Sequence, residues 1–440
     1  MKQIDKSENK IEKSKNIIKK EKQKIKIEKR KQRQNSLNQT KLGRLIVKTF
    51  TPKKKETSSL KEQIFSMIYF ELIGAALCLL ILFALSGGRN YIKLYKDLNK
   101  FINAYDTIQS NYYGKLDKDE LVDKAIDSMV NSIGDNYTTY TEKDASNNIL
   151  EDLEGTYQGI GCMVSMNEQN QIIVINVFED GPAKSAGLQK GDIIAKIDNQ
   201  DFKDKTSEDM ANYVKQNTSN KIKLTVIREE KEKELTITRK KVEVPSVNSQ
   251  LIERDNKKVG YIDITIFSSV TYNQFKEHLE KLEKQDIEGL IIDVRNDTGG
   301  YLSAVTDISS LFLKKGQTIY QLEQDKKTKR IKDKTSEKRT YPIAVLINGT
   351  SASASEILAS AIKESYGGIV VGTKSYGKGT VQKTKVLPDG SMLKYTVQHW
   401  LTPNGNWINE KGVEPTIEVE LNLEGNIDNQ LETAIAEVIK

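Results

Sequence analysis

The sequence predicts an α/β (α+β) core, preceded by a smaller β-rich domain, a small helical region and one N-terminal transmembrane helix. Residues 64–86 are almost wholly apolar, and short apolar runs flanked by glycine turns fill residues 153–243. A long alternation of strand-like and helix-like segments then begins at Val259 and defines a core over residues 244–440. A chain of 440 residues is long enough for two or three such domains.

The N-terminal segment is strongly basic. Residues 1–62 carry 21 Lys/Arg against 7 Asp/Glu, a local net charge of +14 within an overall +7, which leaves −7 for the remainder. A net-acidic body argues against nucleic-acid binding by the folded part, because such surfaces are positively charged. We predict that residues 1–63 form a disordered cytoplasmic tail. It either stays solvated or contacts anionic lipid.

The apolar run over residues 64–86 predicts a single transmembrane helix, since about 22 residues at roughly 1.5 Å each span a hydrocarbon core. Glu71 is costly inside a bilayer, but it lies about a third of the way along the run. A cleaved signal peptide is the alternative, and the long hydrophilic segment ahead of the run argues against it. The positive-inside rule then predicts a single-pass cell-membrane protein, with its N-terminus cytoplasmic and the chain from Arg89 onward outside.

The spacing of apolar residues predicts a small helical region over residues 91–152. Apolar side chains recur there with helical spacing in two sets, Leu94, Leu98, Phe101 and Ile102, then Leu121, Ala125, Met129 and Val130.

Two glycine-containing motifs mark residues 153–243. The first, residues 155–164, reads Gly-Thr-Tyr-Gln-Gly-Ile-Gly-Cys-Met-Val, and the second, residues 181–198, contains Gly-Pro-Ala-Lys-Ser-Ala-Gly-Leu and Gly-Asp-Ile-Ile-Ala-Lys-Ile-Asp. Together they resemble PDZ domains. In such domains a glycine loop binds the terminal carboxylate of a peptide, and a strand edge pairs with the peptide backbone.

The PDZ resemblance implies a substrate-binding groove. It assigns the carboxylate loop to Gly159, Ile160 and Gly161, and the side-chain pockets of the groove to Met210 and Val214. The structural alternative is that the glycines serve tight turns and the apolar residues form the domain core.

A serine lies at a predicted strand-to-helix junction. An apolar strand over residues 342–348 leads into Gly349-Thr350-Ser351-Ala352-Ser353-Ala354-Ser355-Glu356, and a helix follows. The N–H groups and dipole of such a helix can stabilise the oxyanion that acyl transfer requires. An equally weighted alternative is that Ser353 and Glu356 only form a capping box at the helix start.

A lysine between two glycines favours the catalytic alternative. Lys378 stands between Gly377 and Gly379, where its ammonium group could be buried in a tight cleft. Burial lowers the pKa of a lysine, so its neutral amine can accept a proton from a serine. Gln382, four residues on and on the same face of a strand, could orient that amine by hydrogen bonding.

These motifs resemble the C-terminal processing peptidases, also called tail-specific proteases, from about Leu94 to the C-terminus. The resemblance implies that Ser353 is the nucleophile, Lys378 the general base and Gln382 the residue that orients the lysine. It also implies an oxyanion hole made by the backbone of Ala354 and Gly299, the latter in Asp293-Val294-Arg295-Asn296-Asp297-Thr298-Gly299-Gly300. Where the family often has Asn-Pro, this chain has Asp297-Thr298, so Gly300 stays open as the alternative donor.

The expected function is that of a membrane-anchored serine endopeptidase that cleaves proteins near their C-termini. Its PDZ domain would bind flexible, apolar C-terminal tails and could gate the site. We expect no cofactor and no metal, because two histidines and two cysteines offer no ligand set at usable spacing. Neither His278 nor His399 lies near the serine motif, which disfavours a Ser–His–Asp triad. The alternative function is a catalytically silent PDZ scaffold at the membrane surface.

The last residues, 429–440, carry Leu431, Ala434, Ile435 and Val438 at helical spacing. This helix could pair two subunits in a homodimer, or it could pack on the core of its own chain.

Overall fold

The computed structural model describes residues 60–85, 91–336, 339–422 and 427–440. The chain divides into two compact units, residues 1–115 and residues 116–440. The basic tail predicted for residues 1–63 lies, apart from its last four residues, outside the described residues.

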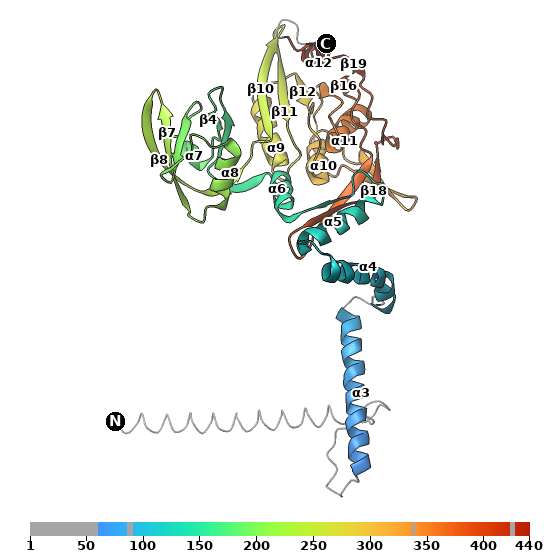
Figure 1. Cartoon of the computed structure of the whole chain (residues 1–440). Coiled ribbons are helices and arrows are strands. Elements are labelled where there is room, and N and C mark those ends of the chain that lie inside the picture. The colour runs from blue at the N-terminus through green and yellow to red at the C-terminus, as the bar shows by residue number, and fades with distance from the viewer. Residues whose placement is uncertain (1–59, 86–90, 337–338, 423–426) are drawn as a thin grey trace, which may run out of the picture. The chain divides into compact units, whose positions relative to one another are not determined.

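The described part of the first unit holds the helices α3 (Leu60–Leu85) and α4 (Tyr91–Asn111) (Figure 1). In α3 the carboxylate of Glu71 interrupts the apolar side chains. Nowhere in the described ranges is a helix both long and apolar enough to cross a lipid bilayer. We therefore correct the prediction of a transmembrane helix over residues 64–86, which accepted a charged residue within the apolar run.

The second unit begins with helices α5 (Lys118–Asn131) and α6 (Lys143–Glu154), between which lies the short strand β1 (Thr139–Thr141). The carboxylate of Asp117 accepts hydrogen bonds from the first free N–H groups of α5 and so fixes where this helix begins. Together with α4, these helices match the predicted helical character of residues 91–152.

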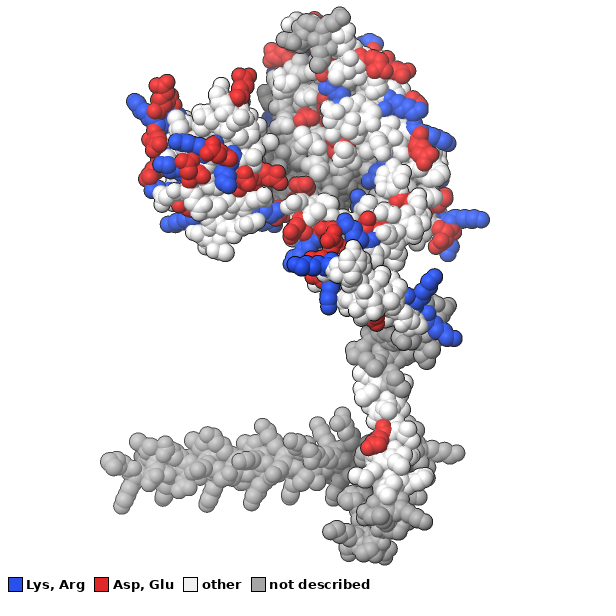
Figure 2. All heavy atoms as spheres, in the orientation of Figure 1, with Lys and Arg blue, Asp and Glu red and all other residues white. Residues whose placement is uncertain are grey.

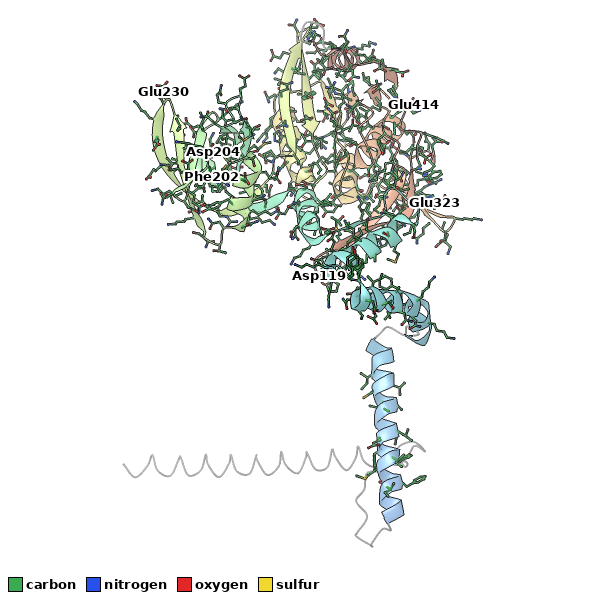
Figure 3. All side chains as sticks on the ribbon, viewed as in Figure 1. Asp119, Phe202, Asp204, Glu230, Glu323 and Glu414 are labelled. Atoms are coloured by element: carbon green, nitrogen blue, oxygen red, sulfur yellow. The ribbon has the colours of Figure 1, made fainter. Side chains whose placement is uncertain are left out.

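An antiparallel sheet with two short helices forms the β-rich domain (Figure 1). Its strands follow the order β3-β4-β5-β7-β8, with β6 beside β5, and β2 pairs separately with β9. Their bounds are β2 (Thr156–Gly159), β3 (Cys162–Met166), β4 (Ile172–Val177), β5 (Ile193–Ile197), β6 (Gln200–Asp201), β7 (Lys221–Arg228), β8 (Lys231–Thr238) and β9 (Lys240–Glu243). The helices are α7 (Pro182–Ser185) and α8 (Ser207–Gln216). Phe202, labelled in Figure 3, lies in its core with its ring 5.5 Å from that of Tyr213.

A six-stranded sheet forms the centre of the larger domain, in the order β10-β11-β12-β15-β16-β19. All neighbours from β11 to β19 are parallel, and only β10 runs antiparallel to its partner. The strands are β10 (Val247–Arg254), β11 (Lys257–Ile264), β12 (Gly289–Asp293), β15 (Ile343–Ile347), β16 (Ile369–Gly372) and β19 (Ile417–Glu418). Because this sheet is covered on both faces, its inner strand β15 is buried and apolar at every position.

Helices cover the two faces of this sheet. Three of them, α9 (Thr271–Glu283), α10 (Leu302–Ser310) and α11 (Ala354–Ala361), share one apolar core with Leu290, Ile292 and Val345. On the other face, α12 (Asn429–Val438) packs Ala434, Ile435 and Val438 against the alternate strand residues Ile291 and Leu346. For this helix the core-packing alternative is therefore the one that the structure supports.

A second antiparallel sheet completes the larger domain. Its strands follow the order β1-β18-β13-β14, and β17 also pairs with β18. The added strands are β13 (Thr318–Gln324), β14 (Lys327–Lys332), β17 (Thr380–Val386) and β18 (Met392–Leu401). The π-helix η1 (Ile362–Tyr366) continues directly from α11.

Surface charges of both signs are interspersed on the face of the molecule shown in Figure 2. Such mixing is typical of a solvated surface, whereas nucleic-acid binding needs a continuous positive stripe.

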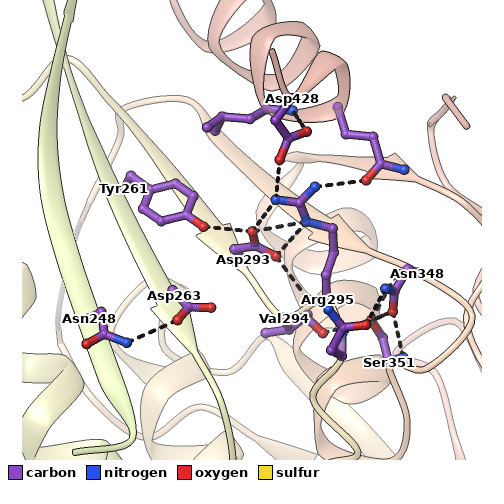
Figure 4. A network of polar contacts seen from close by, with 12 residues as sticks. Asn248, Tyr261, Asp263, Asp293, Val294, Arg295, Asn348, Ser351 and Asp428 are labelled. Atoms are coloured by element: carbon purple, nitrogen blue, oxygen red, sulfur yellow. Dashed lines mark hydrogen bonds and ion pairs between the residues drawn. The ribbon is translucent and has the colours of Figure 1, made fainter. Parts of the chain in front are cut away.

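A buried polar network ties the end of β12 to α12 (Figure 4). Arg295 binds the carboxylate of Asp293 through two of its nitrogens, and it lies 2.8 Å from a carboxylate oxygen of Asp428. The hydroxyl of Tyr261 donates a 2.8 Å hydrogen bond to Asp293 from the other side. Because Arg295 begins the loop that leads to Gly299, this network fixes the base of that loop.

Removal of the Arg295 side chain should destabilise the fold. The Arg295→Ala variant leaves Asp293 almost fully buried without a cation, which typically costs about 3 kcal/mol in free energy of unfolding. Arg254→Ala is the matched control, since it breaks a solvent-exposed ion pair between the sheet and Glu432 of α12. Urea titration should show a clearly lower midpoint only for Arg295→Ala. Equal midpoints for the two variants would contradict the role assigned to the buried network.

Candidate active site

Three serines surround the start of α11, and only the middle one faces a cavity. The side chains of Ser351 and Ser355 are fully buried, whereas that of Ser353 is partly exposed. Ser351 Oγ donates a 2.7 Å hydrogen bond to the carbonyl of Val294, and Ser355 Oγ donates one of 2.9 Å to the carbonyl of Asp297. The two outer hydroxyls thus join this turn to the 294–300 loop, whereas Ser353 lines the cavity.

Ser353 has an unusual backbone conformation, with φ 55° and ψ −108°. A non-glycine residue at positive φ is strained and persists only where its surroundings impose the conformation. Its N–H donates a 2.8 Å hydrogen bond to Glu356 Oε2, which helps to impose it. The next residue, Ala354, begins α11, so its N–H has no acceptor within the helix and is free to bind an oxyanion.

Gly299, the other predicted oxyanion donor, lies directly against the serine turn. A Cβ at this position would come within 2.9 Å of Ser353 Cβ and 2.9 Å of Ala354 N, so only glycine fits. Gly300 packs elsewhere, since a Cβ there would lie 2.2 Å from the carbonyl oxygen of Phe267. Of the two glycines, the structure brings Gly299 next to Ser353 and Ala354.

In this structure the Gly299 N–H is already bound. It donates a 2.8 Å hydrogen bond to Oδ1 of Asp297, whose side chain is fully buried. The other carboxyl oxygen of Asp297 is buried without a hydrogen-bond partner among the described residues. Burial raises the pKa of Asp297 to about 8, while the Gly299 N–H and Ser355 oppose the rise. In this arrangement the Gly299 N–H already has an acceptor and does not point to a second one among the described residues.

The loop that carries Lys378 packs tightly against residues 407–412. A Cβ on Gly377 would lie 2.8 Å from Gly412 N, and one on Gly379 would lie 2.7 Å from Asn409 N. Both flanking residues must be glycine because a neighbouring segment approaches each of them closely. The carbonyl of Lys378 also accepts a 2.6 Å hydrogen bond from the indole of the buried Trp400.

The ammonium group of Lys378 lies in a partly buried environment. Burial lowers its pKa from the ordinary value of 10.5, Lys394 lowers it further, and Glu356 acts in the opposite direction. Its Nζ lies 5.2 Å from the centre of the Tyr137 ring, a cation–π contact. No hydrogen bond joins this Nζ to Ser353 Oγ in the described part of the chain.

Gln382 lines the same cavity as Lys378, and its side-chain hydrogen bonds go to two threonines rather than to the lysine. Its amide donates to Thr380 Oγ1 at 2.9 Å and to Thr396 Oγ1 at 3.2 Å. The pairing of β17 with β18 shifts register between Val381 and Gln382. The regular alternation of side chains along a strand, from which Gln382 was expected to lie on the same face as Lys378, is therefore interrupted just before Gln382.

One cavity of about 560 Å³ brings most of the predicted catalytic residues together. It is lined by Ser353, Lys378, Gln382, Gly299 and Gly300. Ala354 follows Ser353 directly and is itself buried. The remaining wall includes Ile149, Asp152 and Leu153 of α6, so the predicted helical region also contributes to the cavity.

Sequence reasoning missed the polar centre of this site, the carboxylate of Glu356. It is fully buried and accepts hydrogen bonds from the N–H groups of Ser353, Gly377 and Lys378 and from the hydroxyl of Ser375. The capping-box pattern pointed to Glu356 only as a helix-start residue, and nothing in the sequence linked it to residues 375–378. Tyr137, beside the lysine, carried no signal at all.

The residues predicted to bind a peptide tail lie together in the β-rich domain. Gly159 ends β2, and Ile160, Met210 and Val214 are buried in one apolar cluster. Gly161 has φ 80°, which favours glycine, and it leads directly into β3. Strand β3 is at the edge of its sheet, and helix α8, which carries Met210 and Val214, contacts it.

Comparison with protein families matches three regions of the chain. Residues 258–419 match peptidase family S41, and residues 158–238 match the PDZ domain. Residues 85–145 match the N-terminal domain of the activating protease CtpB.

Curated relatives agree with these matches. The chain is 37% identical to the carboxy-terminal processing protease CtpB of Bacillus subtilis over 74% of its own length and 68% of the relative. It is 35% identical to a probable CtpA-like serine protease of Staphylococcus aureus, over 74% of this chain and 65% of that relative. Among solved structures, the photosystem II D1 C-terminal processing protease is similar with a TM-score of 0.44 and 24% identity, covering 76% of this chain and 87% of that one.

The buried carboxyl of Asp297 should make stability depend on pH. Its raised pKa means that the folded state holds a proton that the unfolded state releases above about pH 4, so the free energy of unfolding falls as the pH rises toward about 8. Asp297→Asn keeps a side-chain oxygen for Gly299 and removes the titration. Urea unfolding should therefore favour the variant over the wild type increasingly between pH 5 and pH 8, by about 1 kcal/mol or more.

A difference between the two proteins that stays constant over this pH range would show that Asp297 ionises normally. Asp325→Asn is the matched control, because its side chain is exposed on the larger domain, in the turn between β13 and β14, away from the glycine pair.

Proposed function

Because the chain belongs to peptidase family S41 as a C-terminal processing serine protease with a PDZ domain, we propose that it cleaves proteins near their C-termini through a Ser353–Lys378 site. In this proposal Lys378 takes the proton of Ser353 Oγ as that oxygen attacks the scissile carbonyl. The N–H groups of Ala354 and Gly299 stabilise the oxyanion. Lys378 then gives the proton to the departing amine, and water hydrolyses the acyl-enzyme.

The observation that carries the proposal is the different use of the three serine hydroxyls. Ser351 and Ser355 each donate to a carbonyl of the 294–300 loop, and both are fully buried. Ser353 alone of the three lines the cavity that also contains Lys378, Gln382 and Gly299. A nucleophile must be accessible to a substrate carbonyl, and this requirement singles out Ser353.

The environment of Lys378 supports its role as the base. A lysine must lose its proton to accept one from serine, and both its burial and the nearby Lys394 favour the neutral amine. Two rearrangements would precede acylation in this proposal: Lys378 Nζ leaves the Tyr137 ring for Ser353 Oγ, and the Gly299 N–H leaves Asp297 for the oxyanion. Gln382 is then within the same cavity to orient the amine.

The arrangement of the PDZ domain supports capture of a substrate tail. An extended peptide can add to the free edge of β3 while its apolar side chains lie against α8. The loop over Gly159, Ile160 and Gly161 stands at the start of β3, where the peptide carboxylate would end. We therefore propose that flexible, apolar C-terminal tails are the substrates of this protease.

Cleavage of a peptide with such a tail tests the catalytic assignment. Ser353→Ala and Lys378→Ala should each lower kcat/KM by about 10³-fold, since one removes the nucleophile and the other the base. Lys383→Ala is the matched control, because Lys383 is an exposed lysine on β17 near Lys378 in sequence, and it should keep wild-type activity. Mass spectrometry of the products reports where the chain is cut.

Wild-type activity in either catalytic variant would overturn the assignment. Tail binding by a wild-type chain that cuts no peptide would instead support the alternative of a silent PDZ scaffold. Amidation of the peptide's C-terminal carboxylate separates tail capture from catalysis, because it should weaken binding to Ser353→Ala protein as well as cleavage by the wild type.

A further inference from the structure

The peptidase site is assembled from two loops that are not neighbours in the sequence. Ser353 lies at the turn after β15, and Lys378 lies in the loop between β16 and β17. Proton transfer between them requires their side chains to meet at hydrogen-bonding distance. Some fixed element must therefore hold the two loops in register.

The only fully buried glutamate among the described residues stands between these loops. Glu356 Oε2 accepts the N–H of Ser353 at 2.8 Å and the N–H of Lys378 at 3.0 Å. One oxygen atom thus binds the backbone of both predicted catalytic residues. A displacement of either loop would break one of these two hydrogen bonds.

The second oxygen of the carboxylate holds the lysine loop further along. Glu356 Oε1 accepts the N–H of Gly377 at 2.7 Å and the hydroxyl of Ser375 at 2.6 Å. Ser375 Oγ in turn accepts the N–H of Val413 at 2.6 Å, so the segment that packs against Gly377 joins the same network. The carboxylate is therefore connected to three separate segments of the larger domain.

All four partners of Glu356 are donors. An ionised carboxylate has only acceptor sites and satisfies them, whereas a protonated carboxyl would carry a donor with no acceptor opposite it. Hydrogen bonds from backbone N–H groups to a charged oxygen are also stronger than those between neutral groups. The four donors fit a charged carboxylate and oppose the rise in its pKa that burial causes.

We propose that Glu356 is a positioning residue of the peptidase site, whose charged carboxylate locks the nucleophile turn and the lysine loop together. The inference rests on the proposed Ser353–Lys378 function. Glu356 also has a second effect, because its negative charge lies close enough to Lys378 to favour the ammonium form of the lysine. The charged carboxylate thus orders the site while it opposes deprotonation of the base.

Several titratable groups surround the lysine and must be considered with Glu356. They come from the lysine loop and from every element around it: Tyr376 in the loop itself, Tyr137 before β1, Asp152 on α6, Lys394 on β18 and Glu410 in the segment after it. Of these, Lys394 acts on the lysine with the sign opposite to that of Glu356. Removal of the Lys394 charge should therefore shift the pKa of Lys378 in the direction opposite to that caused by removal of the Glu356 charge.

Steady-state kinetics of tail-peptide cleavage against pH test the inference. Glu356→Gln should lower kcat by about 10²-fold with little change in KM, because misplaced catalytic groups slow chemistry more than binding. Loss of the negative charge also favours the neutral amine of Lys378, so the acid limb of the kcat/KM profile should move to lower pH. Lys394→Met should move the same limb to higher pH.

A merely structural role predicts a different outcome. Glu356→Gln would then lose activity in proportion to lost folded protein, and the remaining activity would keep the wild-type acid limb. That result overturns the inference, as does wild-type kcat in Glu356→Gln. Activity in Ser353→Ala and Lys378→Ala would overturn the proposed function itself. Loss of activity in these two variants together with wild-type kcat in Glu356→Gln would overturn only the role of Glu356.

A second variant covers the case in which Glu356→Gln does not fold. Ser375→Ala removes one of the four donors and leaves the charge in place. It should lower kcat by about 10-fold with an unchanged acid limb, since one loop contact is lost and the electrostatics are kept. Circular dichroism and urea unfolding confirm that the variant is folded, and an unchanged kcat in folded Ser375→Ala protein would contradict the role of the network.

Discussion

The catalytic half of this chain depends on one buried carboxylate whose four hydrogen bonds join the two loops of the candidate site. Glu356 occupies the first turn of α11, and its partners lie both at the serine turn and in the lysine loop. Burying a charge is unfavourable unless hydrogen bonds replace the lost water, and here every partner is a donor. The same contacts hold Ser353 in a backbone conformation that its own side chain disfavours.

The parallel sheet explains how these loops come to meet. Strands β12, β15 and β16 are neighbours, and the 294–300 loop, the serine turn and the lysine segment follow their carboxyl ends. Loops at the carboxyl ends of adjacent parallel strands share one edge of a sheet, which is where ligand sites of open α/β sheets form. The buried hydroxyls of Ser351 and Ser355 then bind the first loop to the second, and Glu356 binds the second to the third.

The sequence predicted the parts of this site better than their arrangement. Ser353, Lys378 and Gln382 could be named because a serine at a strand-to-helix junction and a lysine between glycines are local patterns, and because these patterns resemble the motifs of the C-terminal processing peptidases. The cavity that they share, the pairing of Gly299 with Asp297 and the contact of Lys378 with Tyr137 depend on segments far apart in the chain. Glu356 illustrates the difference, because its capping contact is local whereas its contacts with residues 375–378 are not. The predicted transmembrane helix was wrong for another reason, since the prediction accepted Glu71 within the apolar run, and no helix in the described ranges is long and apolar enough to cross a bilayer.

The proposed chemistry depends on the protonation of a single side chain, so the most direct measurement is the pKa of Lys378 itself. Nuclear magnetic resonance of protein with ¹⁵N-labelled lysine side chains can follow this amine, with Lys378→Arg protein identifying its signal by difference. We expect the titration of Lys378 to fall below the ordinary value of 10.5, because burial and Lys394 both disfavour its charged form. A titration at or above that value would contradict the account, because the lysine would then remain charged and could not accept the proton of Ser353.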